Sequence, residues 1–374
     1  MSESPRPALG EQTNLSWRKQ RAGQRMFLGF QGTTVSDDFR KVVAEIRPAG
    51  FVLFKRNVEE PRQVLELNRE LASLCKDSHP AFLAVDQEGG RVQRIKEPAT
   101  VWPPMRAVGH YAEGVERVSA TMARELRAMG FNLNFAPVAD VDSNPDNPII
   151  GDRSFSRDPA VVAGHVRRFI MAHQQEGVIA CAKHFPGHGD TAVDSHLDLP
   201  WVDREEGVLR EVELVPFQAA VRAGVGTVMT SHVMYPAWDK QLPATLSKRI
   251  IQGILREEMG FQGVVFSDDL EMKAIADRFS LEEQVCRMTE SSVDIFLCCE
   301  SHTLQLEVFR QQVKMQERFE SLEKASMTSD HRVHELRLAH LLEQSRAPDL
   351  QCLGAPDSRA LADDVRRRAK DFDD

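Results

Sequence analysis

Residues 183–196 read KHFPGHGDTAVDSH and bring three histidines, two aspartates and a lysine into one short run. A proline and two glycines interrupt the run, so we expect it to form a loop rather than a helix or a strand. Side chains of these types can hold a metal ion, form a Schiff base or transfer protons. The sequence around the run has to distinguish these three kinds of chemistry.

The metal reading would use His184, His188 and His196, but their spacing matches no familiar ligand signature. The Schiff-base reading would use Lys183, since a desolvated lysine at the end of a strand can become a nucleophile. A single lysine is more often an ion-pair partner or a ligand clamp.

The acid–base reading needs only Asp194 and His196. An aspartate beside a histidine fixes one tautomer of the ring and raises its basicity, which gives a proton shuttle that works near neutral pH. A shuttle carried by a loop can close over a bound substrate.

Two adjacent carboxylates, Asp268 and Asp269, occur in the motif FSDDL. Side chains alternate between the two faces of a strand, so both cannot point the same way. We expect Asp268 to face a functional site and Asp269 to begin the next helix as a cap. In the alternative reading both aspartates are caps.

The motif VDQEGGRVQR places Asp86 before a tight Gly-Gly turn that lets the backbone approach a ligand. Arg91 and Arg94 could then supply charge-assisted donors. A structural Asp–Arg pair within the loop is an equally good reading for Arg91, and the same two readings apply to Arg153 in IIGDRSF.

Eight apolar runs, each followed by a helical pattern, must position these residues. Continuous apolar runs are typical of strands that are buried on both faces. The runs are MFLGF (26–30), FVLF (51–54), FLAV (82–85), LNFAPVA (133–139), VIACA (178–182), GTVMT (226–230), GVVF (263–266) and DIFLC (294–298). One intervening segment, 203–224, is predicted as a single helix that opens with a capping box of Asp203 and Glu206.

This alternation predicts an α/β fold, a (β/α)₈ TIM-type barrel, with a doubly wound open sheet as the alternative. The barrel is favoured because at least five runs end directly in polar groups, which would converge on one rim of a barrel. These groups are Asp86, Asp140, Lys183 with His184, Ser231 with His232, and Asp268.

The two ends of the chain differ from the middle. Residues 1–22 are polar, and residues 346–374 are dense in charge and poor in large apolar groups. We therefore expect a catalytic barrel over 23–345 between two tails that are mobile or loosely docked.

The overall composition argues against several classes of protein. The chain has 374 residues, of which 42% are hydrophobic, and a net charge of −9, which argues against a surface that binds nucleic acid. No apolar run is long enough to span a bilayer, and no secretory apolar segment opens the chain. The six cysteines are scattered without C-x-x-C spacing, which favours a cytoplasmic protein. The oligomeric state is not indicated.

Together these motifs resemble a family of enzymes. Over about residues 25–345, the chain is similar to bacterial family 3 glycoside hydrolases of the β-N-acetylhexosaminidase type, above all the β-N-acetylglucosaminidases of peptidoglycan recycling. The motifs VDQEGGRVQR, FAPVADV, IGDRSF, KHFPGHGD with DSH, and VVFSDDLEM occur in the family's order.

The resemblance implies a role for each candidate residue. Asp268 would be the nucleophile that forms a glycosyl-enzyme intermediate, and His196, paired with Asp194, would be the general acid/base. No metal and no cofactor would be needed. The N-acetyl sugar would be held by Asp86, Arg94, Arg153, Lys183 and His184.

The expected function is retaining exo-hydrolysis of terminal β-linked N-acetylhexosamine, with a small glycoside or peptidoglycan fragment as partner. Three alternatives stay open: phosphorolysis of the same glycoside, a metal-dependent barrel hydrolase, and a sugar-binding barrel without activity. The chain departs from the family's pattern at Asp152, where Glu is expected, and at Phe155, where Tyr is common. These departures put only fine substrate contacts in doubt.

Overall fold

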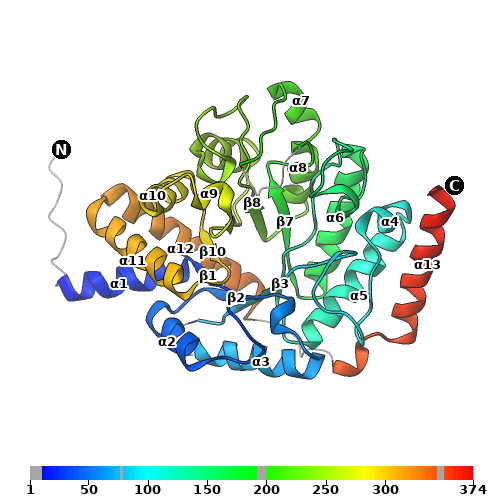
Figure 1. The fold of residues 1–374 in the computed structure, drawn as a ribbon, viewed down its shortest axis with the longest axis horizontal. Helices are drawn as coiled ribbons and strands as arrows, with labels where there is room; N and C mark the ends of the chain where they lie inside the picture. Colours follow the sequence, from blue (N-terminus) through cyan, green and yellow to red (C-terminus); the bar gives the residue numbers. More distant parts are fainter. Residues whose placement is uncertain (1–10, 76–78, 192–198, 343–348, 374) are drawn as a thin grey trace.

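The computed structural model describes residues 11–75, 79–191, 199–342 and 349–373. Within these residues, eight parallel strands close into a barrel in the order β1-β10-β9-β8-β7-β6-β3-β2 (Figure 1). The strands are β1 (Met26–Leu28), β2 (Gly50–Leu53), β3 (Phe82–Val85), β6 (Leu133–Asn134), β7 (Ile179–Phe185), β8 (Thr227–Thr230), β9 (Val264–Asp269) and β10 (Ile295–Cys298). Each strand overlaps one of the eight apolar runs, so the predicted barrel is confirmed and the open sheet is wrong. The strand β7 continues through Phe185, so the expectation that the whole run of residues 183–196 is a loop was wrong for its first three residues.

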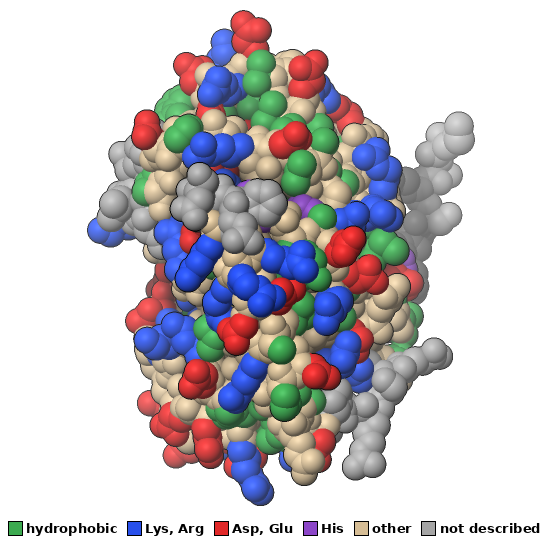
Figure 2. Space-filling view, turned by 90° about the vertical axis from the view of Figure 1, so that its right-hand side faces the viewer, with side chains coloured by type: hydrophobic (Ala, Val, Ile, Leu, Met, Phe, Trp, Pro, Cys, Tyr) green, Lys and Arg blue, Asp and Glu red, His purple; other side chains and the backbone are tan. Residues whose placement is uncertain are grey.

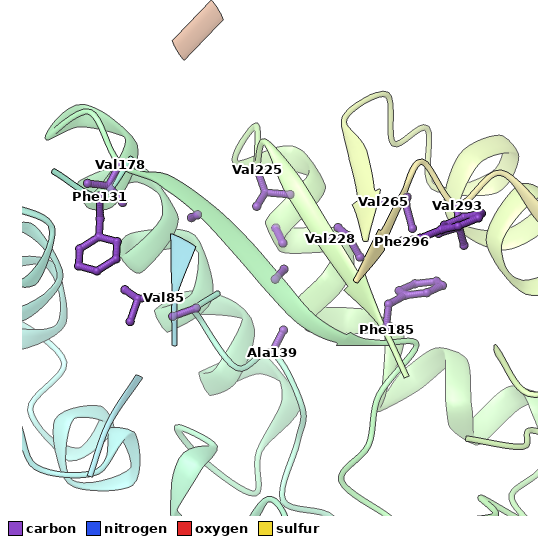
Figure 3. Packing of buried hydrophobic residues seen from close by; sticks show 14 of the residues in the cluster. Val85, Phe131, Ala139, Val178, Phe185, Val225, Val228, Val265, Val293 and Phe296 are labelled. Carbon is purple, nitrogen blue, oxygen red and sulfur yellow. The ribbon is translucent and has the colours of Figure 1, made fainter. Parts of the chain in front are cut away.

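The strands are apolar throughout because both of their faces are buried. On β7, Ile179 and Cys181 belong to a cluster inside the barrel, whereas Ala180 and Ala182 belong to the layer between the barrel and the helices. Figure 3 shows part of this outer layer, with Phe185 at the end of β7. Burial on two faces removes the polar alternation that a half-exposed strand would have.

Helices surround the barrel on all sides visible in Figure 1. They are α1 (Glu11–Gln24), α2 (Asp37–Ile46), α3 (Pro61–Leu74), α4 (Met105–His110), α5 (Gly114–Ala128), α6 (Pro159–Gln175), α7 (Glu206–Glu211), α8 (Leu214–Arg222), α9 (Lys273–Ala276), α10 (Leu281–Ser291), α11 (His302–Arg318), α12 (Glu320–His340) and α13 (Pro356–Asp373). Shorter turns and one π-helix complete the set: η1 (Lys55–Asn57), η2 (Gly151–Arg153), η3 (Ala244–Leu246), the π-helix η4 (Arg249–Glu258) and η5 (Leu350–Cys352).

A small antiparallel hairpin stands outside the barrel. Its strands are β4 (Gln87–Gly89) and β5 (Val92–Gln93), and it directly follows β3. The hairpin therefore rises from the carboxyl end of a barrel strand, which is the end where barrel enzymes carry their active sites.

The prediction of a single capped helix over 203–224 was wrong. Two helices, α7 and α8, occupy this segment, and the N-cap position of α7 is Glu205 rather than Asp203. Periodic apolar residues continue across both helices, so the spacing alone did not reveal the break at Val212 and Glu213.

The described helices of the two tails, α1 and α13, also differ from the expectation of loose docking. The helix α1 packs against α11 and α12, and α13 packs against α4 and α5 on the opposite side of the barrel (Figure 1). Leu361, Ala362 and Val365 of α13 are buried. Among the helices of the described residues, none is both long enough and apolar enough to cross a bilayer.

Candidate active site

A pocket opens where the carboxyl ends of the barrel strands meet. Its charged lining comes from separate elements: Asp86 follows β3, Lys183 and His184 lie in β7, and Asp268 lies in β9. The remaining residues of the lining are Val52, Phe54, Glu88, Val92, Arg94, Phe135, Ile149, Arg153, His188, Met229, Asp269, Met272, Leu297 and Cys299. All six predicted site residues that the structure describes thus face one pocket.

Four of these side chains form a buried network of ion pairs. The Nζ atom of Lys183 lies 2.8 Å from Oδ1 of Asp86 and 2.6 Å from Oε1 of Glu88. Arg153 donates two hydrogen bonds of 2.9 Å to the two carboxylate oxygens of Glu88. This two-point geometry fixes the guanidinium plane more firmly than a single contact would.

The network keeps its members charged despite their burial. Burial alone would raise the pKa of Asp86 and Glu88, but the nearby charges of Lys183, Arg94 and Arg153 outweigh it, so both carboxyls have a pKa below the usual range. For Lys183 burial acts downward, yet the two carboxylates raise its pKa. The Schiff-base reading of Lys183 is therefore unsupported, because the amine is held as an ammonium ion.

Glu88 is a site residue that the sequence analysis missed. It lies two positions after Asp86 in an extended segment, and residues at i and i+2 share a face of such a segment. This spacing from Asp86 was the sequence signal that could have identified Glu88 as a site residue.

Arg94 combines an ion pair with a free donor. Its terminal nitrogen lies 3.5 Å from Oδ2 of Asp86, while its buried Nε atom has no hydrogen-bond partner among the described residues. A buried N–H group without a partner is costly. The Arg94 side chain as a whole is 28% exposed and lines the pocket.

His184 is oriented by a carboxylate behind it. Its Nδ1 atom lies 2.7 Å from Oδ2 of Asp140, and the same carboxylate accepts hydrogen bonds from the backbone N–H groups of His184 and His188. Asp140 is fully buried. The predicted rim residue Asp140 thus acts behind the pocket wall, where it fixes the ring of His184.

His188 contacts the loop that follows it. Its Nδ1 atom lies 2.8 Å from the Thr191 hydroxyl, and burial together with the neighbouring His184 lowers its pKa to about 4. Within the described residues, which leave out His196, no group of three His, Cys, Asp or Glu side chains is placed to hold a metal ion.

Asp268 and Asp269 both line the pocket. Oδ1 of Asp268 accepts a hydrogen bond of 2.8 Å from the Asp269 N–H, and Oδ1 of Asp269 accepts from the backbone of Glu271 and Cys299. The next helix, α9, has Met272 at its N-cap position, so the expected capping role of Asp269 is wrong. Burial and the charge of Glu271 raise the pKa of Asp269 to about 7.

The structure distinguishes between a structural role and a ligand-binding role for Arg91 and Arg153. Arg91 donates to the carbonyl groups of Pro148, Ile149 and Ile150 and lies 3.6 Å from Asp152, so it ties loops together. Arg153 instead lines the pocket through its pair with Glu88.

The first part of the KHFPGHGD motif is tightly fitted. A Cβ atom at Gly189 would lie 1.5 Å from the carbonyl oxygen of Val141, and one at Gly187 would lie 2.4 Å from Oε2 of Glu213. Burial raises the pKa of Glu213 to about 8, so this carboxyl is largely protonated at neutral pH. The predicted acid/base pair, Asp194 and His196, lies outside the described residues.

Comparison with known proteins agrees with this geometry. Residues 30–336 match the family model described as the glycosyl hydrolase family 3 N terminal domain. A β-hexosaminidase of Thiobacillus denitrificans is 38% identical over 296 residues, which cover 76% of this chain and 80% of that protein. β-Hexosaminidase A of Pseudoalteromonas piscicida is 37% identical over 71% of this chain, and the match covers 48% of that longer protein.

A solved structure gives the same picture in three dimensions. The family 3 β-N-acetylglucosaminidase from Paenibacillus sp. FPU-7 superposes with a TM-score of 0.87 at 36% identity, covering 94% of this chain and 68% of that one. A family model that spans most of the chain and relatives above 30% identity lead to one conclusion: the chain belongs to glycosyl hydrolase family 3, among its β-hexosaminidases, and is a glycoside hydrolase.

Proposed function

We propose that this protein is a retaining, exo-acting β-N-acetylglucosaminidase that removes terminal β-linked N-acetylhexosamine. The observation that carries the proposal is the placement of Asp268 in the same pocket as the buried ion network of Asp86, Lys183, Glu88 and Arg153. The network offers fixed charges for binding a polar ring, and Asp268 offers a carboxylate for attack on it.

A sugar presents hydroxyl and acetamide groups that need both donors and acceptors. The carboxylate of Asp86 can accept from a hydroxyl, and the partly exposed guanidinium of Arg94 can donate to an oxygen. We assign Arg153, Lys183 and His184 to the same binding role. Because their side chains are held by Glu88 and Asp140, little ordering is needed when the sugar binds.

The proposed chemistry has two displacement steps. Asp268 attacks the anomeric carbon, the glycosidic C–O bond breaks, and His196 donates a proton to the leaving oxygen. Water then attacks the glycosyl ester, His196 takes a proton from it, and Asp268 leaves as a carboxylate. Two inversions give net retention, as in retaining glycosidases that use two carboxylates. Asp194 is proposed to favour the protonated ring of His196.

We propose fragments of peptidoglycan, with an N-acetylglucosaminyl–anhydromuramyl linkage, as the natural substrate, and the cytoplasm as the location. The motif resemblance supports the substrate. All six cysteines are free thiols, which supports a reducing compartment. Cleavage of such a fragment should exceed that of a plain N-acetylglucosamine disaccharide; equal rates on both would contradict this substrate.

The deciding experiment is release of phenol from an aryl β-N-acetylglucosaminide in buffer that contains a chelator. Steady release by the wild type, with none from Asp268→Ala, would support the proposal, and NMR of the first-formed sugar should show the β-anomer. Activity that appears only after zinc is added would favour the metal-dependent alternative. Binding of N-acetylglucosamine without any release would favour a sugar-binding barrel.

Phosphate as the acceptor is tested in the same assay. A neutral histidine as the proton acceptor would not repel an incoming phosphate as a carboxylate would. We expect free N-acetylglucosamine as the product with and without phosphate. A sugar 1-phosphate as the main product would replace hydrolysis by phosphorolysis.

A further inference from the structure

The segment that follows the family match, η5 and α13, packs on the side of the barrel next to the active-site hairpin. The helix α13 lies along α4 and α5 (Figure 1), and Figure 2 shows basic and acidic side chains interspersed over this face. Beneath them, the buried residues Leu361, Ala362 and Val365 fix the helix on the barrel. The family model ends at residue 336, so this packing is an addition to the matched domain.

The connection between η5 and α13 is fitted closely against the loop of residues 96–101. At Gly354, where φ is +54°, a Cβ atom would lie 2.0 Å from the carbonyl oxygen of Pro98. Arg359 donates to the same carbonyl, and Arg366 donates to the carbonyl of Val101. Two hydrogen bonds and the close approach of the Gly354 backbone thus join the C-terminal segment to one short loop.

Glu125 joins the C-terminal segment to the loop of residues 96–101. This side chain on α5 is only 3% exposed, and its Oε1 atom accepts hydrogen bonds from the Gly354 N–H at 2.8 Å and from the Thr100 hydroxyl at 2.7 Å. Its Oε2 atom accepts from the Thr100 N–H at 3.1 Å. One buried carboxylate therefore holds the loop and the C-terminal segment together.

The loop in turn holds the hairpin of β4 and β5. Gln93 of β5 donates to the carbonyl of Thr100 at 2.8 Å and accepts from the Trp102 N–H at 3.0 Å. The Gly90 N–H at the hairpin turn donates to the carbonyl of Trp102 at 3.0 Å. A Cβ atom at Gly90 would lie 2.8 Å from the Cα of Pro104, so the turn has no room to shift outward.

The hairpin carries three residues of the pocket: Glu88 within β4, Val92 within β5 and Arg94 directly after β5. We propose that the C-terminal segment Leu350–Asp373 is a positioning element of the active site, and that Glu125 is the positioning residue through which it acts. The contacts run from Gly354 through Glu125 and Thr100 to the hairpin. The inference rests on the proposed sugar-binding role of the hairpin residues.

The test uses full-length Gly354→Val, which places a side chain against Pro98. A displaced hairpin should weaken sugar binding in the ground state and the transition state alike. We expect KM for the aryl glycoside and Ki for N-acetylglucosamine to rise about tenfold, with kcat changed far less, measured well below the melting temperature. Thr100→Val, which removes only the hydroxyl bonded to Glu125, should shift both constants in the same direction by a smaller factor.

Two controls separate positioning from stability. Gly224→Val also replaces a glycine of positive φ (+71°), but the space around it is open and it lies at the end of α8. It should lower the melting temperature and leave KM and Ki unchanged. Arg367→Ala, at an exposed position of α13, should leave both KM and Ki unchanged.

Unchanged KM and Ki in a folded Gly354→Val variant would overturn the inference, and so would a loss confined to kcat. If that variant does not fold, Thr100→Val decides by the same criteria. Failure of the proposed function is recognised separately, because wild-type protein would then release no phenol and bind no N-acetylglucosamine.

Discussion

Glu88 and Arg153 are 65 positions apart in the chain, yet they meet in a parallel pair of hydrogen bonds, each 2.9 Å long. The pair links the hairpin after β3 to the turn η2. Lys183 of β7 contacts the same carboxylate. A single side chain thereby joins three separate segments at the barrel mouth.

Replacement of Glu88 by Gln should destabilise the protein strongly. It leaves the buried charges of Arg153 and Lys183 without one of their partners, and breaking a buried pair costs about 3–5 kcal/mol. Urea unfolding measures the loss. The matched control is Glu66→Gln, which breaks an exposed pair with Arg62 and should cost less than about 1 kcal/mol. Equal losses in the two variants would contradict a stabilising role for the buried pair.

Replacement of Asp268 by Ala should abolish turnover of every glycoside, because no other group is proposed to form the covalent bond. Added azide should restore activity in this variant by attacking the anomeric carbon from the vacated side. The released sugar azide should then have the α-configuration, opposite to the substrate, because only one displacement occurs. Full activity in Asp268→Ala without azide would remove Asp268 from its assigned role.

Replacement of His196 by Ala should slow the reaction in proportion to how poor the leaving group is. A nitrophenolate needs little protonation and an alcohol needs much, so the loss in kcat/KM should grow along a series of aryl and alkyl glycosides. A proton-transfer group typically contributes about 10²–10⁴-fold. The same loss across the whole series would count against the acid/base assignment.

Replacement of Glu213 by Gln should change how stability depends on pH. Burial raises the pKa of Glu213 to about 8 from an ordinary value of 4.5. The stability that the protonated Glu213 contributes is therefore fully present below pH 4.5, where the carboxyl is protonated in both states. It is lost as pH rises from 4.5 to about 8, because the unfolded chain then releases a proton that the native protein retains. Relative to the wild type, Glu213→Gln should gain on the order of 5 kcal/mol between pH 4.5 and pH 8.

Urea unfolding at several pH values measures this trend. Glu211→Gln, at an exposed position nearby, is the control and should follow the wild type at every pH. A flat difference between Glu213→Gln and the wild type would mean that Glu213 is ionised in the native protein.

The barrel itself could be predicted because its strands are short apolar runs with both faces buried. The polar residues that end those runs also gave part of the pocket, since parallel strands bring their carboxyl ends to one rim. Asp86, Lys183 and Asp268 were found in this way.

Other parts depend on contacts that local patterns do not encode. Glu88 becomes a site residue only through Arg153 and Lys183, which are far from it in sequence. The segment of α13 was expected to be a solvated tail because it is dense in charge and has few large apolar residues. Its described buried residues Leu361, Ala362 and Val365 pack against a surface formed by α4 and α5, which lie far from it in the sequence. The roles of Asp194 and His196 stay predictions.

The glycines of the KHFPGHGD motif occupy places where there is no room for any other residue. Gly189 lies against the Val141 carbonyl, and Gly187 lies against Glu213. In a library of single substitutions, both positions should therefore tolerate nothing larger than glycine, as core positions do, although they lie in a loop. For protein engineering, this means that both glycines have to be kept, and changes of specificity have to be sought at other residues that line the pocket.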